Sequence, residues 1–151
     1  MKFKMELKGL NKLEKKLSNI ENKVAKKIVR SASRKAQNIA AKEVKLNAIS
    51  MVGGEMGNLI ASAMKVQAIH KQKKGSYALA VAIDKKKAEQ FLHTTKAGKR
   101  YFIPTLVEFG YKKVGGGKVP ANPFMRKAAE KTAKKRVNKV FSEINKGIDK
   151  A

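Results

Sequence analysis

The 151-residue chain contains no cysteine, no tryptophan and only two histidines. The absence of cysteine excludes disulfides, thiolate nucleophiles and cysteine-ligated metal sites, and it suits a reducing compartment. His70 and His93 have no second histidine or cysteine at a metal-ligand spacing. We therefore expect both histidines to be solvated, and we predict no metal site and no cofactor.

Long apolar runs are also missing. No segment approaches the roughly 18 apolar residues of a membrane-spanning helix. The first ten residues alternate charged and apolar side chains, so they lack the apolar segment of a signal peptide. We expect a soluble protein that is neither secreted nor inserted in a membrane.

Acidic residues are scarce, whereas basic residues are abundant. The chain has 36 lysines and arginines against 11 acidic residues, a formal net charge of +25. This charge exceeds what solubility requires and predicts an anionic partner or a place in an assembly. Most of it is lysine, whereas proteins that read DNA sequence favour the forked arginine side chain. A genome biased toward lysine codons would produce the same excess without any nucleic-acid contact, and this alternative stays open.

The length suits one domain, residues 1–151, and the hydrophobic pattern divides it into segments. Residues 2–8 alternate apolar and charged side chains, which predicts a strand. Residues 10–48 carry an apolar stripe at helical spacing, from Leu10 through Ile28 and Ala32 to Leu46, and predict one long helix. Its weakest point is the small, polar stretch 31–33, where a bend is expected. Residues 50–58 contain three glycines and are expected to end the helix as a loop.

Two hairpin strands are predicted within residues 61–84, where apolar residues alternate on either side of a lysine-rich turn. The second strand is apolar on both faces, so we expect it to be central, with its alanine face approached closely by a helix or a neighbouring subunit. Residues 85–100 are dense in charge and predict an exposed loop long enough to reach a partner. The cations of that loop, candidates for contact with a partner or DNA, are Lys85, Lys86, Lys87, Lys96, Lys99 and Arg100.

Residues 101–119 form a corner that contains VEFG and a run of three glycines. Glu108 lies inside an apolar run, so we expect it to be buried and paired with a lysine or arginine rather than catalytic. Gly110 is expected in a tight turn. The glycines at 115–117 do not complete a phosphate-binding loop, because Gly116 stands where that motif requires lysine. A flexible connector to the last helix explains them better.

The last helix is predicted over residues 123–148. Asn122 is the expected N-cap and Pro123 the expected first helical residue. Phe124 lies off the apolar stripe and is expected to anchor the helix entrance. The stripe itself consists of Ala133, Val137, Val140, Phe141, Ile144 and Ile148. Together these segments predict an α+β fold, in which a small antiparallel sheet packs against a long N-terminal helix and a C-terminal helix.

Two sequence pieces, VEFG at 107–110 and PANPFMRKA at 120–128, resemble the signature of the small head–tail joining proteins of long-tailed bacteriophages, a family of tail-completion, minor tail and neck proteins. The order of the other segments, beginning with LKGL at 7–10, is similar over nearly the whole chain. Met56-Gly57 and Asn122 depart from the residues usual in that family. The structural signature under this resemblance comprises Val107, Glu108, Phe109, Gly110, Pro120, Asn122, Pro123 and Phe124.

The resemblance implies a non-enzymatic structural subunit of the phage neck or head–tail connector. Such a subunit would form a homo-oligomeric ring, a hexamer or a dodecamer, through which genomic DNA passes. Its neighbours would be connector or stopper proteins and tail terminator or tail tube proteins, in the virion after assembly in the host cytoplasm. A channel that lets DNA slide should not grip it through many lysines, so we expect much of the charge to serve docking of acidic partners.

Two other function classes remain open. A basic nucleic-acid-binding protein without catalytic activity fits the net charge and the two lysine-rich helices, although few aromatic residues are interleaved with cations as in single-strand binders. A metal-dependent nuclease would need clustered acids, and only Glu108 and Asp84 are candidates.

Overall fold

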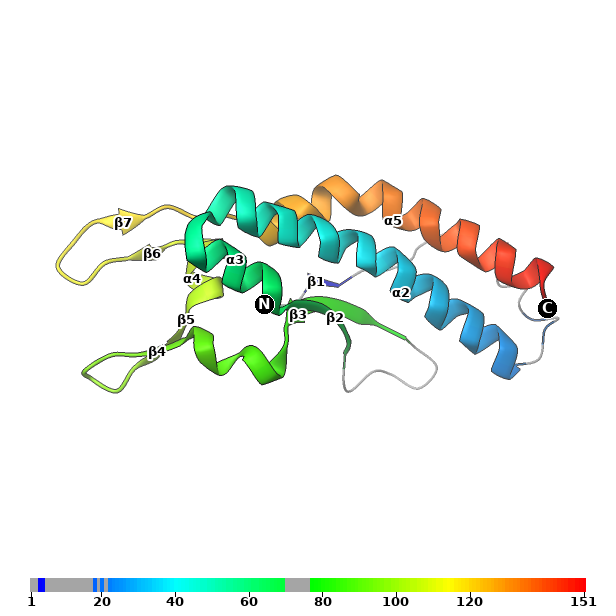
Figure 1. Cartoon of the computed structure of the whole chain (residues 1–151), viewed down its shortest axis with the longest axis horizontal. Helices are drawn as coiled ribbons and strands as arrows, with labels where there is room; N and C mark the ends of the chain where they lie inside the picture. The colour runs from blue at the N-terminus through cyan, green and yellow to red at the C-terminus, as the bar shows by residue number, and fades with distance from the viewer. Residues whose placement is uncertain (1–2, 5–17, 19, 21, 70–76) are drawn as a thin grey trace.

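Two long antiparallel helices, α2 (Asn22–Asn47) and α5 (Phe124–Asp149), run along the length of the protein (Figure 1). The structure is a computed structural model, and it describes residues 3–4, 18, 20, 22–69 and 77–151. A three-stranded antiparallel sheet, with the order β1 (Phe3–Lys4), β3 (Leu79–Ile83) and β2 (Met64–Ala68), packs against α2. The predicted α+β fold is confirmed.

Shorter elements join these parts, and most of them lie at one end of the molecule (Figure 1). In chain order they are the π-helical turn η1 (Ala48–Val52), α3 (Gly54–Ala63), the 3-10 turns η2 (Lys85–Lys87) and η3 (Glu89–Phe91), the paired strands β4 (Leu92–Thr94) and β5 (Arg100–Phe102), α4 (Ile103–Phe109), and the paired strands β6 (Tyr111–Lys112) and β7 (Lys118–Val119). None of the described helices combines the length and apolar character that crossing a membrane would need.

The contact between α2 and α5 is built from small and aliphatic side chains. Ala32 and Ala36 of α2 cluster with Val140 and Ile144 of α5, and Ala36 has no exposed surface. Near the far end, a Cβ on Gly147 would lie 2.6 Å from Cγ2 of Ile28. Because the facing residues are so small, the two helices can approach closely.

The predicted stripe of α2 is only partly correct. Ala32 lies in the interface as expected, but the side chain of Leu46 is 60% exposed. The helix runs without interruption through the expected bend at residues 31–33, where Ala32 and Ser33 are buried. Residues 10–17, 19 and 21 of the predicted helix lie outside the described residues, as do His70 and all of the predicted strand 2–8 except residues 3–4.

The buried face of α5 also differs from its predicted stripe. Val140 and Ile144 are buried, whereas Ala133 is exposed. Arg136 is buried instead: its Nη2 donates to the carbonyl oxygen of Ala129 at 3.1 Å, and its Nη1 donates to Oε1 of Gln37 at 3.5 Å. Burial lowers the pKa of Arg136. Hydropathy could not predict that Arg136 is buried, because its burial depends on hydrogen-bond partners on a turn of α5 and on α2.

The central strand β3 is apolar on both faces, as predicted. Val81 pairs with Val66 and belongs to the same core cluster as Ala40 and Val44 of α2. The helix α2 therefore covers the face of the sheet that carries the larger side chains. The alanines that allow this close approach lie on α2. On the opposite face of the strand, Ala80 is buried.

The predicted loop at residues 50–58 is wrong. The structure has helical turns on both sides of one break at Gly53, whose φ of 72° favours glycine. Gly57 lies inside α3, and a Cβ there would come within 2.5 Å of the carbonyl oxygen of Ala48. Gly53 permits a sharp break between two helical segments, and Gly57 permits their close contact. The glycine content was therefore a sign of tight helix packing and not of a loop. Because α3 continues to Ala63, the first hairpin strand begins at Met64 rather than at 61.

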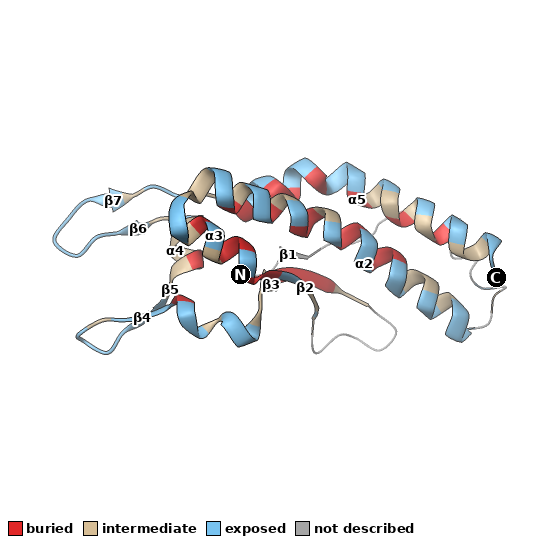
Figure 2. Ribbon diagram, viewed as in Figure 1, coloured by how far each residue is buried: buried red, intermediate tan, exposed pale blue. Residues whose placement is uncertain are grey.

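The segment 85–100 is largely exposed, as predicted, but it is not a structureless loop. It contains the turns η2 and η3 and most of a hairpin, in which His93 pairs with Tyr101. Phe91 is fully buried, and its ring meets that of Phe102 edge-on with centroids 6.0 Å apart. Figure 2 shows buried residues along the facing sides of α2 and α5 and in β3, and exposed residues along the hairpins. One buried aromatic thus ties a highly charged segment to the core.

Ion pairs join the two long helices at their surface. Nζ of Lys35 on α2 lies 2.6 Å from Oε2 of Glu143 on α5, and Nζ of Lys139 lies 3.0 Å from the other oxygen. Nζ of Lys131 lies 2.6 Å from Oε1 of Glu43. The hydrogen bond from Lys35, followed by that from Lys139, lowers the pKa of Glu143 to about 2.

This shift predicts an acid-sensitive contribution to stability. The folded-state pKa of Glu143 lies below its ordinary value of 4.5, so the contribution is complete above about pH 5 and is lost as the pH falls to about 2. We expect Glu143→Gln to be less stable than the wild type at pH 7, with the difference disappearing near pH 2. Urea unfolding across this pH range measures it, with the exposed Glu130→Gln as control. A difference that is unchanged between pH 7 and pH 2 would contradict the assignment.

Candidate functional site

The VEFG and PANPF segments meet at the start of α5. Glu108 lies on α4, and its side chain is buried. Its Oε2 accepts a hydrogen bond from the backbone N–H of Met125 at 2.9 Å, and its Oε1 accepts one from the N–H of Arg126 at 3.0 Å. The first N–H groups of a helix have no partner within it and carry partial positive charge. Glu108 therefore caps α5 from a different element.

The expected partner of Glu108 is thus wrong in kind. We predicted a lysine or arginine as the partner of Glu108. The Glu108 carboxylate instead accepts hydrogen bonds from backbone N–H groups in the first turn of α5. A helix N-terminus offers converging N–H groups that attract an anion as a cation would. The cap also uses both carboxylate oxygens, so the contact fixes the orientation of α4 relative to α5.

Asn122 is not the N-cap of α5, contrary to the prediction. The helix begins at Phe124, Pro123 occupies the cap position, and no side chain caps the helix from there. The backbone N–H of Asn122 donates to the carbonyl oxygen of Val107 at 2.8 Å, and its Nδ2 donates to the carbonyl oxygen of Met51 at 2.6 Å. Asn122 therefore links α4 and η1 to the approach of α5, while Glu108 supplies the cap.

Gly110 turns the chain at the end of α4, as predicted. Its φ is 70°, and its N–H donates to the carbonyl oxygen of Leu106 at 2.8 Å. A Cβ at this position would lie 2.6 Å from the carbonyl oxygen of Val119 and 2.7 Å from the nitrogen of Ala121. The chain that leads from β7 to α5 therefore crosses directly over Gly110, and only glycine leaves room for it.

Phe124 anchors the entrance of α5, as predicted. Its side chain is fully buried in the cluster that contains Ala40 and Val44, and its carbonyl oxygen accepts a hydrogen bond from Nδ2 of Asn47 at 3.0 Å. Val107 packs against the same cluster. Phe109 differs from these signature residues, because its ring is 65% exposed.

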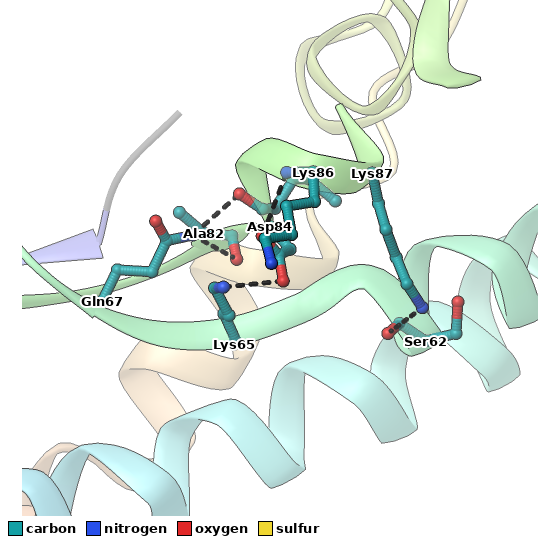
Figure 3. A network of polar contacts seen from close by, with 8 residues as sticks. Ser62, Lys65, Gln67, Ala82, Asp84, Lys86 and Lys87 are labelled. Carbon is teal, nitrogen blue, oxygen red and sulfur yellow. Dashed lines mark hydrogen bonds and ion pairs between the residues drawn. The ribbon is translucent and has the colours of Figure 1, made fainter. Parts of the chain in front are cut away.

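The six predicted contact cations do not form one group. Lys85, Lys86 and Lys87 lie in η2, which follows the end of β3 beside the start of β2, and Lys86 and Lys87 belong to the polar network of Figure 3. In that network Nζ of Lys87 donates to the carbonyl oxygen of Ser62 at 3.2 Å. The other three, Lys96, Lys99 and Arg100, lie on the β4–β5 hairpin.

Asp84 has a structural partner in the same network. Its Oδ2 lies 2.6 Å from Nζ of Lys65, and its Oδ1 accepts a hydrogen bond from the N–H of Lys86 at 3.1 Å (Figure 3). The hydrogen bond from Lys65 is the main cause that lowers the pKa of Asp84. Glu108 and Asp84, the two candidate acids, are bound to separate partners. Within the described ranges, no three histidines, cysteines or acids lie close enough to hold a metal ion.

An apolar pocket lies between the sheet and the start of α5. Its lining includes Met64, Ile83, Phe102 and Met125, with Lys85 as its charged residue. Gln67 also lines the pocket, but its Nε2 donates to the carbonyl oxygen of Ile83 at 2.8 Å. This lining provides a cation beside apolar surface and no pair of groups suited to acid–base chemistry.

The glycine run forms the turn of a hairpin, and the predicted flexible connector is therefore wrong. The N–H of Lys113 donates to the carbonyl oxygen of Gly117 at 3.0 Å, and β6 pairs with β7 through Tyr111 and Val119. The sequence pattern missed this hairpin because each strand has only two residues. The sequence analysis also did not single out the cations of this hairpin. The absence of acidic residues between Phe109 and Ala129 could have indicated them.

No protein-family model, curated protein or solved structure matches the chain. The residues and their geometry carry the functional argument. The buried carboxylate of Glu108, the glycine at 110 and the ring of Phe124 together hold the start of α5.

The cap predicts a large cost for removing the carboxylate. We expect Glu108→Ala to lower the free energy of unfolding by about 2–4 kcal/mol, because two N–H groups lose their acceptor and a small void forms. Glu108→Gln, which keeps the volume, should cost less. Urea unfolding measures both, with the exposed Glu130→Ala as a control expected to change stability by less than about 0.5 kcal/mol. Equal effects of Glu108→Ala and Glu130→Ala would contradict the cap.

The crossing over Gly110 predicts a difference between two glycines that both have positive φ. Gly98→Ala should cost about 1–2 kcal/mol from backbone strain, because a Cβ there meets no atom within 4 Å. Gly110→Ala should cost about 2–5 kcal/mol, because the same strain is joined by a clash with backbone atoms. Thermal and urea unfolding compare the two variants. A smaller loss at Gly110 than at Gly98 would show that the crossing is not tight.

Proposed function

We propose that this chain is a non-enzymatic structural subunit of the neck of a long-tailed bacteriophage. In this role it is a tail-completion protein that joins head and tail as part of a homo-oligomeric ring, through which genomic DNA passes. The observation that carries the proposal is that the two signature pieces, VEFG and PANPF, form one structural unit. Glu108 caps α5, Gly110 admits the crossing chain, and Phe124 fills the core beneath them.

The use of these residues supports a structural role. A signature that marks an enzyme would place reactive side chains around a cavity, whereas Glu108 here is bound by two backbone N–H groups. Val107 and Phe124 pack in the core, and Asn122 joins three segments by hydrogen bonds. What these residues share is that they set the position of α5 relative to α4 and the sheet.

The shape of the molecule also suits an assembly. A body of two long helices and a sheet carries hairpins that extend from one end (Figure 1). A ring subunit contacts its neighbours through two different surfaces, and repeated head-to-tail contacts close by rotation. In the proposed ring, connector or stopper proteins lie on the head side, and tail terminator or tail tube proteins lie on the tail side.

A basic nucleic-acid-binding protein is the second candidate, and one observation favours it. Exposed cations line α2 over most of its length: Lys23, Lys26, Lys27, Arg30, Arg34, Lys42 and Lys45. Such a row could contact the phosphates of a duplex without reading its bases. Under this alternative the purified protein would shift duplex DNA, with an affinity that falls steeply as salt rises.

Phage particles made without this subunit test the proposed function. We expect electron micrographs to show separate heads and tails, because the ring that joins them is missing. Supplying the wild-type chain should restore joined particles. Joined particles in the absence of the subunit would refute the joining role, and steeply salt-dependent binding of duplex DNA would then favour the second candidate.

A further inference from the structure

Two hairpins and the end of α4 lie at one end of the molecule. The β4–β5 hairpin leads into α4, the β6–β7 hairpin leaves it, and both extend away from the long helices (Figure 1). We call residues 92–102 together with residues 109–119 the arm face. The base of the second hairpin is held by the crossing over Gly110 and by the hydrogen bond from Asn122 to Val107.

The arm face and the start of α5 carry only positive charge at their surface. Residues 90–129 contain a single acid, Glu108, which is buried and caps α5. The cations of this stretch are Lys96, Lys99, Arg100, Lys112, Lys113, Lys118, Arg126 and Lys127. No ion pair among the described residues involves any of them. An anionic partner would relieve this repulsion.

Exposed apolar side chains are concentrated on the same surface. Eight large apolar residues are exposed in the described part of the chain, and five of them lie on the arm face: Leu92, Tyr101, Phe109, Tyr111 and Val114. Phe109 is 65% exposed at the end of α4, and Val114 is fully exposed at the tip of the β6–β7 hairpin. Grouped apolar side chains of this kind mark a binding surface, whereas single ones are ordinary.

We propose that the arm face docks onto an acidic protein surface. Phe109 and Val114 enter apolar depressions of that partner, and Lys112, Lys113 and Lys118 face carboxylates around them. This arrangement has the apolar anchors and polar rim of a protein interface. The inference rests on the proposed function only in taking the partner to be a neighbouring component of the neck.

Other occupants satisfy only part of this surface. A duplex would accept the lysines through its phosphates but offers no apolar surface to Phe109 along its backbone. A bilayer would receive Val114 at the tip, whereas Phe109 lies at the base of the hairpin. A second copy of this chain has the same excess of positive charge, so it would repel the arm face. Only an acidic protein matches both the cations and the anchors.

Binding to synthetic probes tests the inference on the full chain. One probe is a peptide of about 20 residues in which glutamates alternate with leucines, a length close to one side of a standard interface. The second carries the same number of glutamates with serines in place of the leucines, and the third is a short duplex DNA. Fluorescence anisotropy should show the wild type binding the leucine peptide about tenfold more tightly than the serine peptide.

Two sets of variants locate the binding. Lys112→Glu, Lys113→Glu and Lys118→Glu together should weaken binding of the leucine peptide by about tenfold or more. The matched control, Lys23→Glu, Lys26→Glu and Lys27→Glu, changes the charge equally at the far end of α2 and should have little effect (Figure 1). Phe109→Ser with Val114→Ser should remove the preference for leucine and leave binding of the serine peptide unchanged.

Three results would overturn the proposal. An equal loss of peptide affinity in the two triple lysine variants would mean that net charge alone binds the probes. A leucine preference that persists in the Phe109→Ser, Val114→Ser variant would show that these two side chains are not the apolar anchors. Tighter binding of duplex DNA that only the arm triple abolishes would assign the surface to nucleic acid. Circular dichroism and the midpoint of urea unfolding verify that each variant is folded, since all the altered residues are exposed.

The phage experiment separates this inference from the proposed function. One outcome is that heads and tails separate without the subunit, yet are joined by the variant with three substituted arm-face lysines as well as by the control variant. In that case the joining role stands, and the arm face is not the surface through which the subunit docks. If particles join without the subunit, the neck role fails, and the peptide measurements decide the inference about the arm face independently.

Discussion

The buried carboxylate of Glu108 determines how the signature end of this protein is arranged. It accepts hydrogen bonds from two N–H groups in the first turn of α5, so the start of a 26-residue helix is tied to α4. α4 in turn ends at Gly110, over which the chain passes before it reaches Phe124. Without an acceptor at this point, two helix donors would be left in a largely buried site. The orientation of both hairpins depends on the same contact, because they leave α4 at its two ends.

Small side chains make the rest of the body compact. Alanines on α2 face aliphatic residues of α5 on one side and the large-residue face of the sheet on another, so the helix approaches both closely. Gly57 has the same effect between α3 and η1. The buried Arg136 is compatible with this packing because its guanidinium reaches a carbonyl oxygen of its own helix and Gln37 of α2. Close packing and buried side-chain hydrogen bonds therefore occur in the same interface.

Acidic residues have different roles on the long helices and at the end that carries the arm face. On the long helices, Glu43 and Glu143 pair with lysines across the interface, so part of the positive charge stabilises the contact between the helices. At the other end, the only acid of residues 90–129 is withdrawn into the cap, and the surface keeps unopposed cations beside exposed Phe109 and Val114. One carboxylate thus organises the fold locally and, because it is buried, leaves the arm face uniformly basic. Self-repulsion of such a surface favours an acidic partner.

Local periodicity in the sequence was enough to predict the two long helices, the apolar central strand β3, the turn at Gly110 and the anchor at Phe124. These features depend on residues a few positions apart, which is the range over which apolar spacing and turn chemistry act. The partner of Glu108, the hydrogen bonds of Asn122, the helical turns at 48–63 and the two hairpins were decided only by the tertiary structure. Glu108 and its donors are 17 and 18 residues apart, and Asn122 and Met51 are 71 apart. Contacts over such separations depend on how whole elements pack, which no local pattern encodes.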